Sequence, residues 1–252
     1  MTPDLVRVDI AGRVLVVTMQ REAKRNAIDR AMADALDAAF NRLDDDDELW
    51  VGVLAGTERF FSAGSDLTAD GDYVTPRGGE YGLVRRRRRK PLIAAVDGPA
   101  LGGGLELVLA CDLVVAGRTA RFGLPEVGIG VVPTCGALFR APRQLPLNVA
   151  RQLVLTGDPL SAEDAYRLGF VNILTEPGEA TAAGRALADR ICSNGPVAVR
   201  ASMAALEQVV TSDDAAGWAA TATATDRIRA SADAVEGVRA FLEKRSPQWS
   251  GR

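Results

Sequence analysis

The sequence predicts an α/β fold in which strands and helices alternate along roughly the first two thirds of the chain. Two observations support this prediction. Short apolar, β-branched runs recur between amphipathic or glycine-rich segments, and from about residue 176 the pattern becomes wholly helical and rich in alanine. We therefore divide the chain into a core over residues 1–175 and a C-terminal helical region over residues 176–252. With 252 residues, 47% of them hydrophobic, the chain can bury a sizeable core without disulfides.

The predicted strands are the apolar runs that end at turn signals. They lie at residues 5–10, 14–19, 50–55, 92–96, 113–116 and 170–174. Only Ala11-Gly12-Arg13 separates the first two, which predicts a hairpin at the start of the fold.

The predicted helices follow apolar spacing and capping residues. Asp29 is expected to cap a helix over residues 30–43, and Ser161 with Asp164 has the pattern of a capping box. Further helices are predicted over residues 81–90, 105–110, 133–144, 146–155, 161–168 and 179–242, the last broken at Gly195-Pro196 and Ser212-Asp213. Residues 70–80, rich in Gly, Asp and Pro, are predicted to form a mobile segment.

Composition excludes several classes of function. The formal net charge of −3 argues against a general polyanion binder. No apolar run approaches the ~18 residues that span a bilayer, and residues 1–10 lack the basic and apolar regions of a signal peptide. We therefore expect a cytoplasmic protein that contacts neither nucleic acid nor membrane.

The counts of cysteine and histidine limit the chemistry further. Cys111, Cys135 and Cys192 lie far apart and lack the spacing of metal ligands, which predicts reduced thiols and no metal site. The chain has no histidine, so Ser-His-Asp and Cys-His nucleophilic systems and the usual zinc sites are excluded. Catalysis must rest on carboxylates, backbone donors, hydroxyls, thiols or cations.

Residues 92–128 are the most informative stretch. A strand ends at Asp97-Gly98-Pro99, three glycines follow, and the apolar helix after them carries one acid, Glu106. Residues three and four positions from Glu106 have apolar or no side chains. This acid is therefore either structural, as a helix cap or part of an ion pair, or functional. Glu126 follows the next strand and Pro125. Two carboxylates on separate elements can face each other across a small site, one as base and one as acid.

Two further segments are candidate ligand sites. Residues 60–66, after the strand at 50–55, have mostly small side chains, which let backbone N–H groups approach a ligand; an ordinary turn is the alternative. Residues 85–90 are five arginines and a lysine. Nucleic-acid binding, a solvated helix end and a contact for an anionic ligand are the alternatives for this run. Without interleaved aromatic residues, the run is weak evidence for nucleic acid.

The chain resembles the crotonase family, the enoyl-CoA hydratases and isomerases, in an ordered set of segments. IAAVDGPALGGGLELVLACDL at residues 93–113 resembles the family's signature stretch, and FFSAGSDL at 60–67 resembles its first oxyanion-loop motif. FGLPEVGIGVVP at 122–133 is similar to its second-acid segment, and KRNAID at 24–29 to its early CoA-contacting loop. The resemblance extends to about residue 175, and the helical tail fits it.

The resemblance implies a crotonase-like spiral of ββα units, with a C-terminal helical region that makes homotrimers or dimers of trimers. It also implies an acyl-CoA thioester substrate, with CoA as part of the substrate and no bound cofactor or metal. The expected activity is that of an enoyl-CoA hydratase, which adds water across the double bond of a 2-enoyl-CoA to give a 3-hydroxyacyl-CoA.

The resemblance assigns catalytic roles to four residues. The backbone N–H groups of Ser65 and Gly103 are expected to bind the thioester oxygen. Glu106 is expected to hold and activate the water, and protonated Glu126 to supply the Cα proton.

Four more residues are expected to contact CoA: Lys24, Arg25, Ala63 and Asp66. Cations suit its phosphates, although Lys24 and Arg25 can also be plain surface charges. Asp66 is expected mainly to fix its loop as a hydrogen-bond acceptor.

The sequence departs from the family after Pro133, where Thr134-Cys135-Gly136-Ala137 replaces the common Gly-Ala-Gly-Gly. A bulkier Thr134 is expected to narrow the acyl pocket or displace the water, whereas Cys135 is expected to be a packing residue. Two alternatives therefore stay open: a 3-enoyl to 2-enoyl-CoA isomerase that uses Glu126, and a CoA-thioester binder with little turnover.

Overall fold

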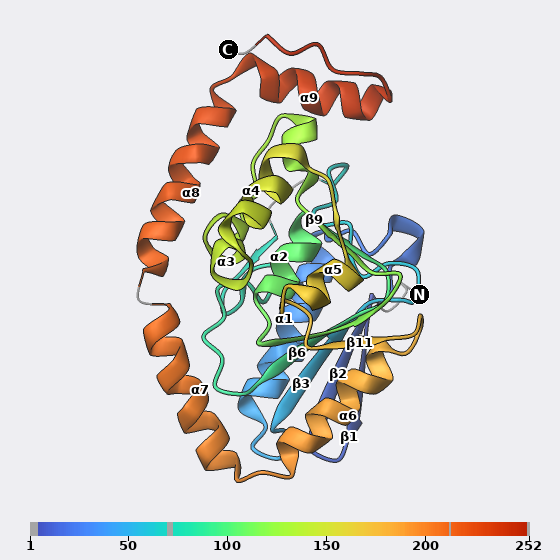
Figure 1. Cartoon of the computed structure of the whole chain (residues 1–252), viewed down its shortest axis with the longest axis vertical. Coiled ribbons are helices and arrows are strands. Elements are labelled where there is room, and N and C mark those ends of the chain that lie inside the picture. The colour runs from blue at the N-terminus through green and yellow to red at the C-terminus, as the bar shows by residue number, and fades with distance from the viewer. Residues whose placement is uncertain (1–4, 70–72, 212, 251–252) are drawn as a thin grey trace.

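A computed structural model describes residues 5–69, 73–211 and 213–250 (Figure 1). Its main feature is a six-stranded sheet with the strand order β1-β2-β3-β6-β8-β11. The first two strands pair as the predicted antiparallel hairpin, and the others are parallel. Their bounds are β1 Val6–Ala11, β2 Val14–Met19, β3 Val51–Ala55, β6 Leu92–Val96, β8 Leu113–Gly117 and β11 Ile173–Thr175.

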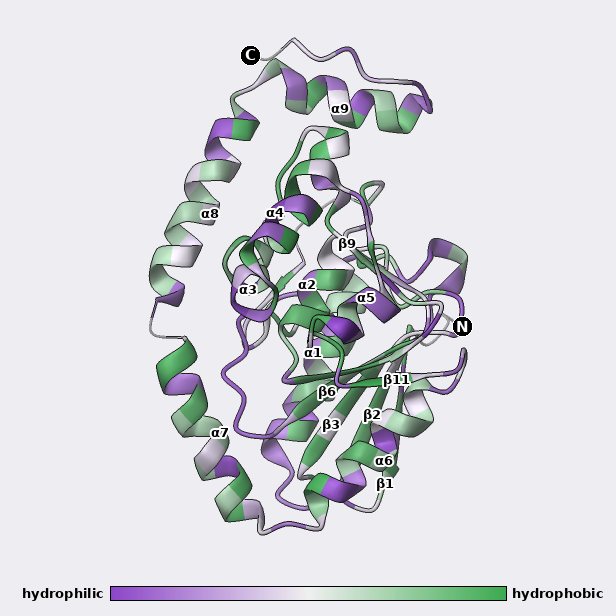
Figure 2. Cartoon of the chain, in the orientation of Figure 1, coloured by the Kyte–Doolittle hydropathy of each residue, from purple (hydrophilic) through white to green (hydrophobic). Residues whose placement is uncertain are grey.

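Helices cover both faces of this sheet. In β2, Leu15 and Val17 belong to the core that includes α1 (Arg30–Asp45). Val14 and Val16 alternate with them and belong to a second core beneath α6 (Ala180–Cys192). Both faces are therefore buried, which explains why the strands have near-continuous apolar sequences (Figure 2).

A smaller sheet places the two candidate acids near each other. It consists of β7 (Pro99–Leu101), β9 (Arg121–Gly123) and β10 (Leu160–Ser161), and β7 and β9 are parallel with Leu101 opposite Gly123. The chain continues from β7 into α2 (Gly103–Leu109), which carries Glu106, and from β9 into the 3₁₀ turn η2 (Pro125–Ile129), which carries Glu126. Because β7 and β9 run in parallel, the segments that follow them, α2 and η2, lie at the same edge of this small sheet. Glu106 and Glu126 are therefore brought to that edge.

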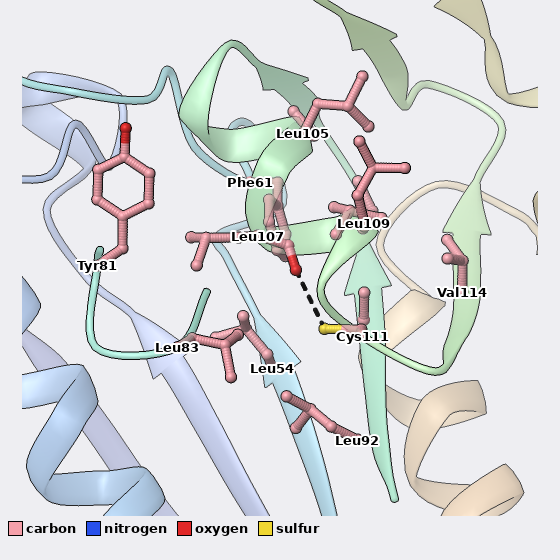
Figure 3. Close-up of a cluster of buried hydrophobic side chains, with 14 of the residues drawn as sticks. Leu54, Phe61, Tyr81, Leu83, Leu92, Leu105, Leu107, Leu109, Cys111 and Val114 are labelled. Carbon is pink, nitrogen blue, oxygen red and sulfur yellow. Dashed lines mark hydrogen bonds between the residues drawn. The ribbon is translucent and has the colours of Figure 1, made fainter. Parts of the chain in front are cut away.

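The core beneath α2 anchors that helix firmly. Leu105, Leu107 and Leu109 are buried among side chains from β3, β6 and β8 (Figure 3). The Cys111 thiol also donates a hydrogen bond to the Leu107 carbonyl, 3.3 Å away (Figure 3). Glu106 is therefore positioned by a rigid element.

The remaining helices pack around the body or extend from it. Those near the body are α3 (Ala137–Gln144), α4 (Leu147–Thr156) and α5 (Ala162–Arg167). After α6, helices α7 (Pro196–Val210), α8 (Asp214–Arg229) and α9 (Ala232–Glu243) curve around the outside (Figure 1). In the ranges that the structure describes, no helix is long and apolar enough to cross a membrane.

Most sequence predictions of elements are confirmed within a few residues. Asp29 caps α1 by accepting from the Met32 N–H at 2.9 Å, and Ser161 caps α5 by accepting from the Asp164 N–H at 3.0 Å. The last strand begins three residues later than predicted, at Ile173. The helical tail has an additional break at Ser231, which caps α9. The predicted break at Ser212 lies outside the described residues.

The prediction of a helix over residues 81–90 is wrong. This segment forms turns, because Tyr81 and Gly82 have φ angles of +56° and +74°, which an α-helix cannot contain. Within the segment predicted to be mobile, Val74–Thr75 (β4) and Gly79–Glu80 (β5) form a small antiparallel pair. Residues 70–72 lie outside the described part of the chain.

The basic run at residues 85–90 is largely structural. The Arg86 guanidinium is buried and contacts Asp37 at 2.5 Å and Asp44 at 2.8 Å. Arg88 pairs with Asp112, and the Lys90 ammonium donates to the carbonyls of Leu43 and Asp46, each at 2.7 Å. These contacts fix the end of α1 and the start of β6, so these three cations are not available to a polyanion.

Arg86→Met is expected to lower the free energy of unfolding by about 3 kcal/mol, because it leaves Asp37 buried without its cation. The matched control is Arg87→Met, since the neighbouring side chain is exposed and is expected to change stability by less than about 0.5 kcal/mol. Urea unfolding of both variants measures the difference. Equal stability of the two variants would show that the buried ion pair has no net structural role.

Candidate active site

The loop after β3 is held by one buried side chain, that of Asn26. The Asn26 side-chain amide donates to the carbonyls of Phe60 at 2.9 Å and Phe61 at 3.0 Å, and the backbone carbonyl of Asn26 accepts from the Ser62 hydroxyl at 2.8 Å. Asn26 is fully buried and has a φ of +52°, a conformation that Asn tolerates better than most residues. The loops that contain Lys24 and Ser65 are therefore fixed to each other.

Ser65 lies where this loop pairs with the chain before α1. The Ile28 N–H donates to the Gly64 carbonyl at 2.8 Å, and the Asp66 N–H donates to the Ile28 carbonyl at 2.9 Å. Between these two bonds, the Ser65 N–H has no hydrogen-bond acceptor among the described residues. It can therefore donate to a ligand.

The start of α2 lies against the same loop. A Cβ on Gly64 would lie 2.7 Å from the Gly103 nitrogen, so only glycine allows this approach. As the first residue of α2, Gly103 has an N–H with no acceptor within the helix. The structure thus brings Ser65 and Gly103 onto adjacent backbone segments, each with an N–H that can bind a ligand oxygen.

Glu106 is buried with one carboxylate oxygen bound to the backbone. Its side chain is on α2, the residue is 2% exposed, and its Oε1 accepts from the Cys135 N–H at 2.7 Å and the Ala137 N–H at 3.0 Å. Burial raises the pKa of Glu106 to about 7, although these two N–H donors oppose the shift. Glu106 therefore neither caps a helix nor forms an ion pair among the described residues.

Glu126 approaches the start of α2 from η2. Its Oε1 lies 3.2 Å from the position that a Cβ on Gly102 would occupy, a tight contact, and the φ of +55° at Gly102 would strain any side chain there. Its Oε2 is buried and has no hydrogen-bond partner in the described part of the chain. Burial, followed by the nearby charge of Glu106, raises the pKa of Glu126 to about 8.

These two acids can divide proton transfer between them. Near neutral pH, Glu126 holds its proton, whereas Glu106 with its two N–H donors is the more readily ionised of the pair. One group can then donate a proton while the other accepts one. Among the described residues, no cluster of His, Cys, Asp and Glu is arranged to hold a metal ion.

The four residues expected to contact CoA lie around the same two loops. Lys24 and Arg25 are exposed, and the Lys24 ammonium is 3.4 Å from the Thr68 hydroxyl. The Ala63 N–H donates to the Arg25 carbonyl at 3.0 Å. Asp66 accepts from Arg21 at 2.8 Å and from the Thr68 hydroxyl at 2.6 Å. The prediction that Asp66 fixes its loop is confirmed, and these bonds, chiefly that from Thr68, lower its pKa to about 2.

The sequence did not identify two side chains that lie at the site. Arg21 bridges Asp29 at 2.9 Å and Asp66 at 2.8 Å, and so joins α1 to the loop that follows β3. Tyr81 is fully buried, and its hydroxyl lies 2.8 Å from the Ser65 hydroxyl. Neither has a local signal in the sequence, because the contacts of both connect segments far apart in the chain.

A large hollow lies away from the two acids. It measures about 830 Å³ and lies between α7 and the body, beside Arg88, Asp112 and Glu207. We place the candidate site at Glu106 and Glu126 instead, because unpaired N–H donors and acids with raised pKa values converge there.

The raised pKa of Glu126 makes stability depend on pH. The folded chain keeps this proton up to about pH 8, whereas an unfolded glutamate loses it near pH ~4.3. Between these values the folded state binds more protons than the unfolded state, so the free energy of unfolding falls as pH rises. Relative to wild type, Glu126→Gln is therefore expected to gain thermal stability between about pH 5 and about pH 9.

The matched control is Glu58→Gln, which changes an exposed carboxylate. Its melting temperature is expected to follow that of wild type across the range. A difference between Glu126→Gln and wild type that stays constant with pH would contradict the raised pKa.

The chain is similar to known proteins along nearly its whole length. A family model described as enoyl-CoA hydratase/isomerase matches residues 9–252. Enoyl-CoA hydratase EchA19 of Mycobacterium tuberculosis is 36% identical over 262 residues, covering 99% of this chain and 97% of that relative. A carnitinyl-CoA dehydratase of Salmonella typhi is 38% identical over 252 residues, covering 96% of each.

A solved structure with a similar fold is the carnitinyl-CoA hydratase from Mycobacterium avium. It has a TM-score of 0.95 and 39% sequence identity, and the match covers 100% of both chains. The crotonase-like fold predicted from the sequence is thereby confirmed. This chain belongs to the crotonase family, the enoyl-CoA hydratases and isomerases.

Proposed function

We propose that the protein is an enoyl-CoA hydratase that adds water to a 2-enoyl-CoA thioester and forms a 3-hydroxyacyl-CoA. The observation that carries this proposal is a pair of buried acids, Glu106 and Glu126, beside the start of α2, where the N–H groups of Ser65 and Gly103 lack acceptors among the described residues. Relatives that are named hydratases or dehydratases align with nearly the whole chain, and they support the same type of reaction.

Two N–H donors would stabilise the charge that forms during the reaction. When water adds at Cβ, negative charge develops on the thioester oxygen. The N–H groups of Ser65 and Gly103 lie on segments fixed by Asn26 and by the contact of Gly64 with Gly103, so they need little reorganisation. One such donor typically contributes about 3 kcal/mol of transition-state stabilisation.

The two acids would move the protons. Glu106, as the carboxylate, accepts a proton from the water while the water oxygen bonds to Cβ. Glu126, as the acid, delivers its proton to Cα. The water proton then rests on Glu106 and returns to Glu126 through the next bound water, which restores the starting state. Each acid is expected to contribute roughly 10²–10⁴-fold to the rate.

We assign CoA to the exposed edge of the loops that contain Lys24, Arg25, Ala63 and Asp66. Lys24 and Arg25 are exposed cations and suit phosphate groups. Assembly into a homotrimer, or a dimer of trimers, is part of the proposal. Exposed apolar side chains on the outer helices support it, because a monomer gains nothing from exposing them. Those that are at least half exposed include Val197, Leu206, Val209, Val235 and Phe241.

The decisive test follows the loss of enoyl-thioester absorbance when the purified protein is mixed with crotonyl-CoA. Glu106→Gln and Glu126→Gln are each expected to lower kcat by at least about 100-fold, because each removes one proton-transfer group. Glu58→Gln is the matched control and is expected to retain the wild-type rate. If either active-site variant retained full rate, the role of that acid would be wrong.

The same experiment separates the alternatives. Wild-type protein that is inactive on crotonyl-CoA but converts a 3-enoyl-CoA into a 2-enoyl-CoA would be an isomerase that relies on Glu126. Binding without turnover of either substrate would indicate a CoA-thioester binder. Carnitinyl-CoA is the third substrate to test, because relatives named carnitinyl-CoA dehydratase align with 96% of this chain.

A bell-shaped pH profile is also expected. Glu106 acts when ionised, so kcat/KM rises as pH increases through about 7, and Glu126 acts when protonated, so kcat/KM falls as pH increases through about 8. Because the two acids interact, the apparent pKa values of the two limbs of the profile belong to the pair and not to single residues. Measurement of kcat/KM from about pH 5 to about pH 10 checks this, and a flat profile across that range would exclude the pair as acid and base.

A further inference from the structure

We infer that Tyr81 is a positioning residue that fixes the spacing of the two N–H donors and links them to the loop that holds Glu106. This inference rests on the proposed function. It concerns a side chain that lies outside the assigned catalytic residues, in a turn between β5 and β6.

Tyr81 touches both donor segments with one functional group. Its hydroxyl lies 2.8 Å from the Ser65 hydroxyl. A Cβ built on Gly103 would lie 2.2 Å from the same hydroxyl oxygen and 2.6 Å from the ring carbon that bears it. The tip of the Tyr81 ring therefore rests on the Gly103 backbone, where no side chain fits, while its hydroxyl binds Ser65.

The direction of the hydrogen bonds assigns a donor role to Tyr81. The Ser65 hydroxyl donates to the Tyr73 hydroxyl at 3.0 Å. Each hydroxyl has one hydrogen, so Ser65 can only accept from Tyr81. Tyr73 and Tyr81 also stack with their ring centroids 4.8 Å apart. Removing the Tyr81 hydroxyl would thus remove a donor from Ser65 and leave the stacked rings in place.

Tyr81 also reaches the loop that holds Glu106. The Cys135 side chain lies near the Tyr81 hydroxyl and the Glu106 carboxylate, and the Cys135 N–H is one of the two backbone donors to Glu106. Tyr81 thus binds Ser65 and lies near the loop whose N–H group donates to Glu106.

The backbone at Tyr81 supports this role. Tyr81 has a φ of +56°, which is rare for an aromatic residue, and its side chain is 1% exposed. Such conformations persist where the surrounding contacts require them. In Figure 3, Tyr81 stands beside α2 with its hydroxyl directed away from the leucine cluster. Packing accounts for the ring, and the contacts with Ser65 and Gly103 account for the position of the hydroxyl.

The test compares Tyr81→Phe with the matched control Tyr73→Phe, each of which removes one hydroxyl bound to Ser65. The Tyr81 hydroxyl also rests on the Gly103 backbone and lies near Cys135. With crotonyl-CoA, Tyr81→Phe is expected to lower kcat about fivefold to tenfold with little change in KM, the effect of one lost neutral hydrogen bond on the transition state. Tyr73→Phe is expected to stay within about twofold of wild type.

A double variant separates positioning from packing. Ser65→Ala keeps the backbone N–H and removes the partner of Tyr81, so Ser65→Ala/Tyr81→Phe is expected to be no slower than Tyr81→Phe. The acidic limb of the kcat/KM profile is expected to move in Tyr81→Phe and not in Tyr73→Phe. Equal losses in the two Phe variants, or full activity and an unchanged profile in Tyr81→Phe, would overturn the inference.

A spectroscopic readout keeps this test independent of turnover. Donors aimed at a conjugated thioester oxygen polarise it, so bound cinnamoyl-CoA is expected to absorb at longer wavelength than free cinnamoyl-CoA. Tyr81→Phe is expected to lose part of this shift, and Tyr73→Phe to keep it. If wild type shifted the spectrum but hydrated no enoyl-CoA, the proposed function would fail while the role of Tyr81 could still be measured. An undiminished shift in Tyr81→Phe would remove that role.

Discussion

Burial of the Glu106 carboxylate is the constraint on which the site depends. A buried carboxylate is stable only where hydrogen-bond donors face it, and here the donors are the N–H groups of Cys135 and Ala137. These residues precede and begin α3, so satisfying one acid on α2 fixes the start of a second helix. The conformation of the loop between Pro133 and α3 thus follows from the position of one side chain.

The other constraint is close contact between backbones. Gly64 and Gly103 touch because neither has a side chain, and Gly102 leaves room for Glu126. The parallel pairing of β7 with β9 brings Gly102 near Glu126, and the bridge between Ser62 and Ala100 places the loop of Gly64 beside them. A small sheet therefore sets the geometry, and glycines allow the final approach of N–H groups and carboxylate.

The sequence predicted much of the fold, because the buried strands are short apolar runs and Asp29 and Ser161 mark helix starts. It also identified Glu106, since an acid in an apolar helix is conspicuous without any knowledge of tertiary contacts. The helix predicted over residues 81–90 was wrong because a basic run favours helix, whereas positive φ angles at Tyr81 and Gly82 depend on long-range packing. For the same reason, the contacts of Tyr81 with Ser65 and Gly103 could not be predicted.

Hydrogen bonding, more than burial, separates the two acids in the proposed mechanism. Both carboxyls are removed from water, which raises both pKa values. Glu106 receives two N–H donors that stabilise its charged form, whereas Glu126 Oε2 receives none from the described residues. When Glu106 is ionised, its negative charge makes ionisation of Glu126 still less favourable. The proton therefore resides on Glu126, and the residue with fewer donors becomes the acid.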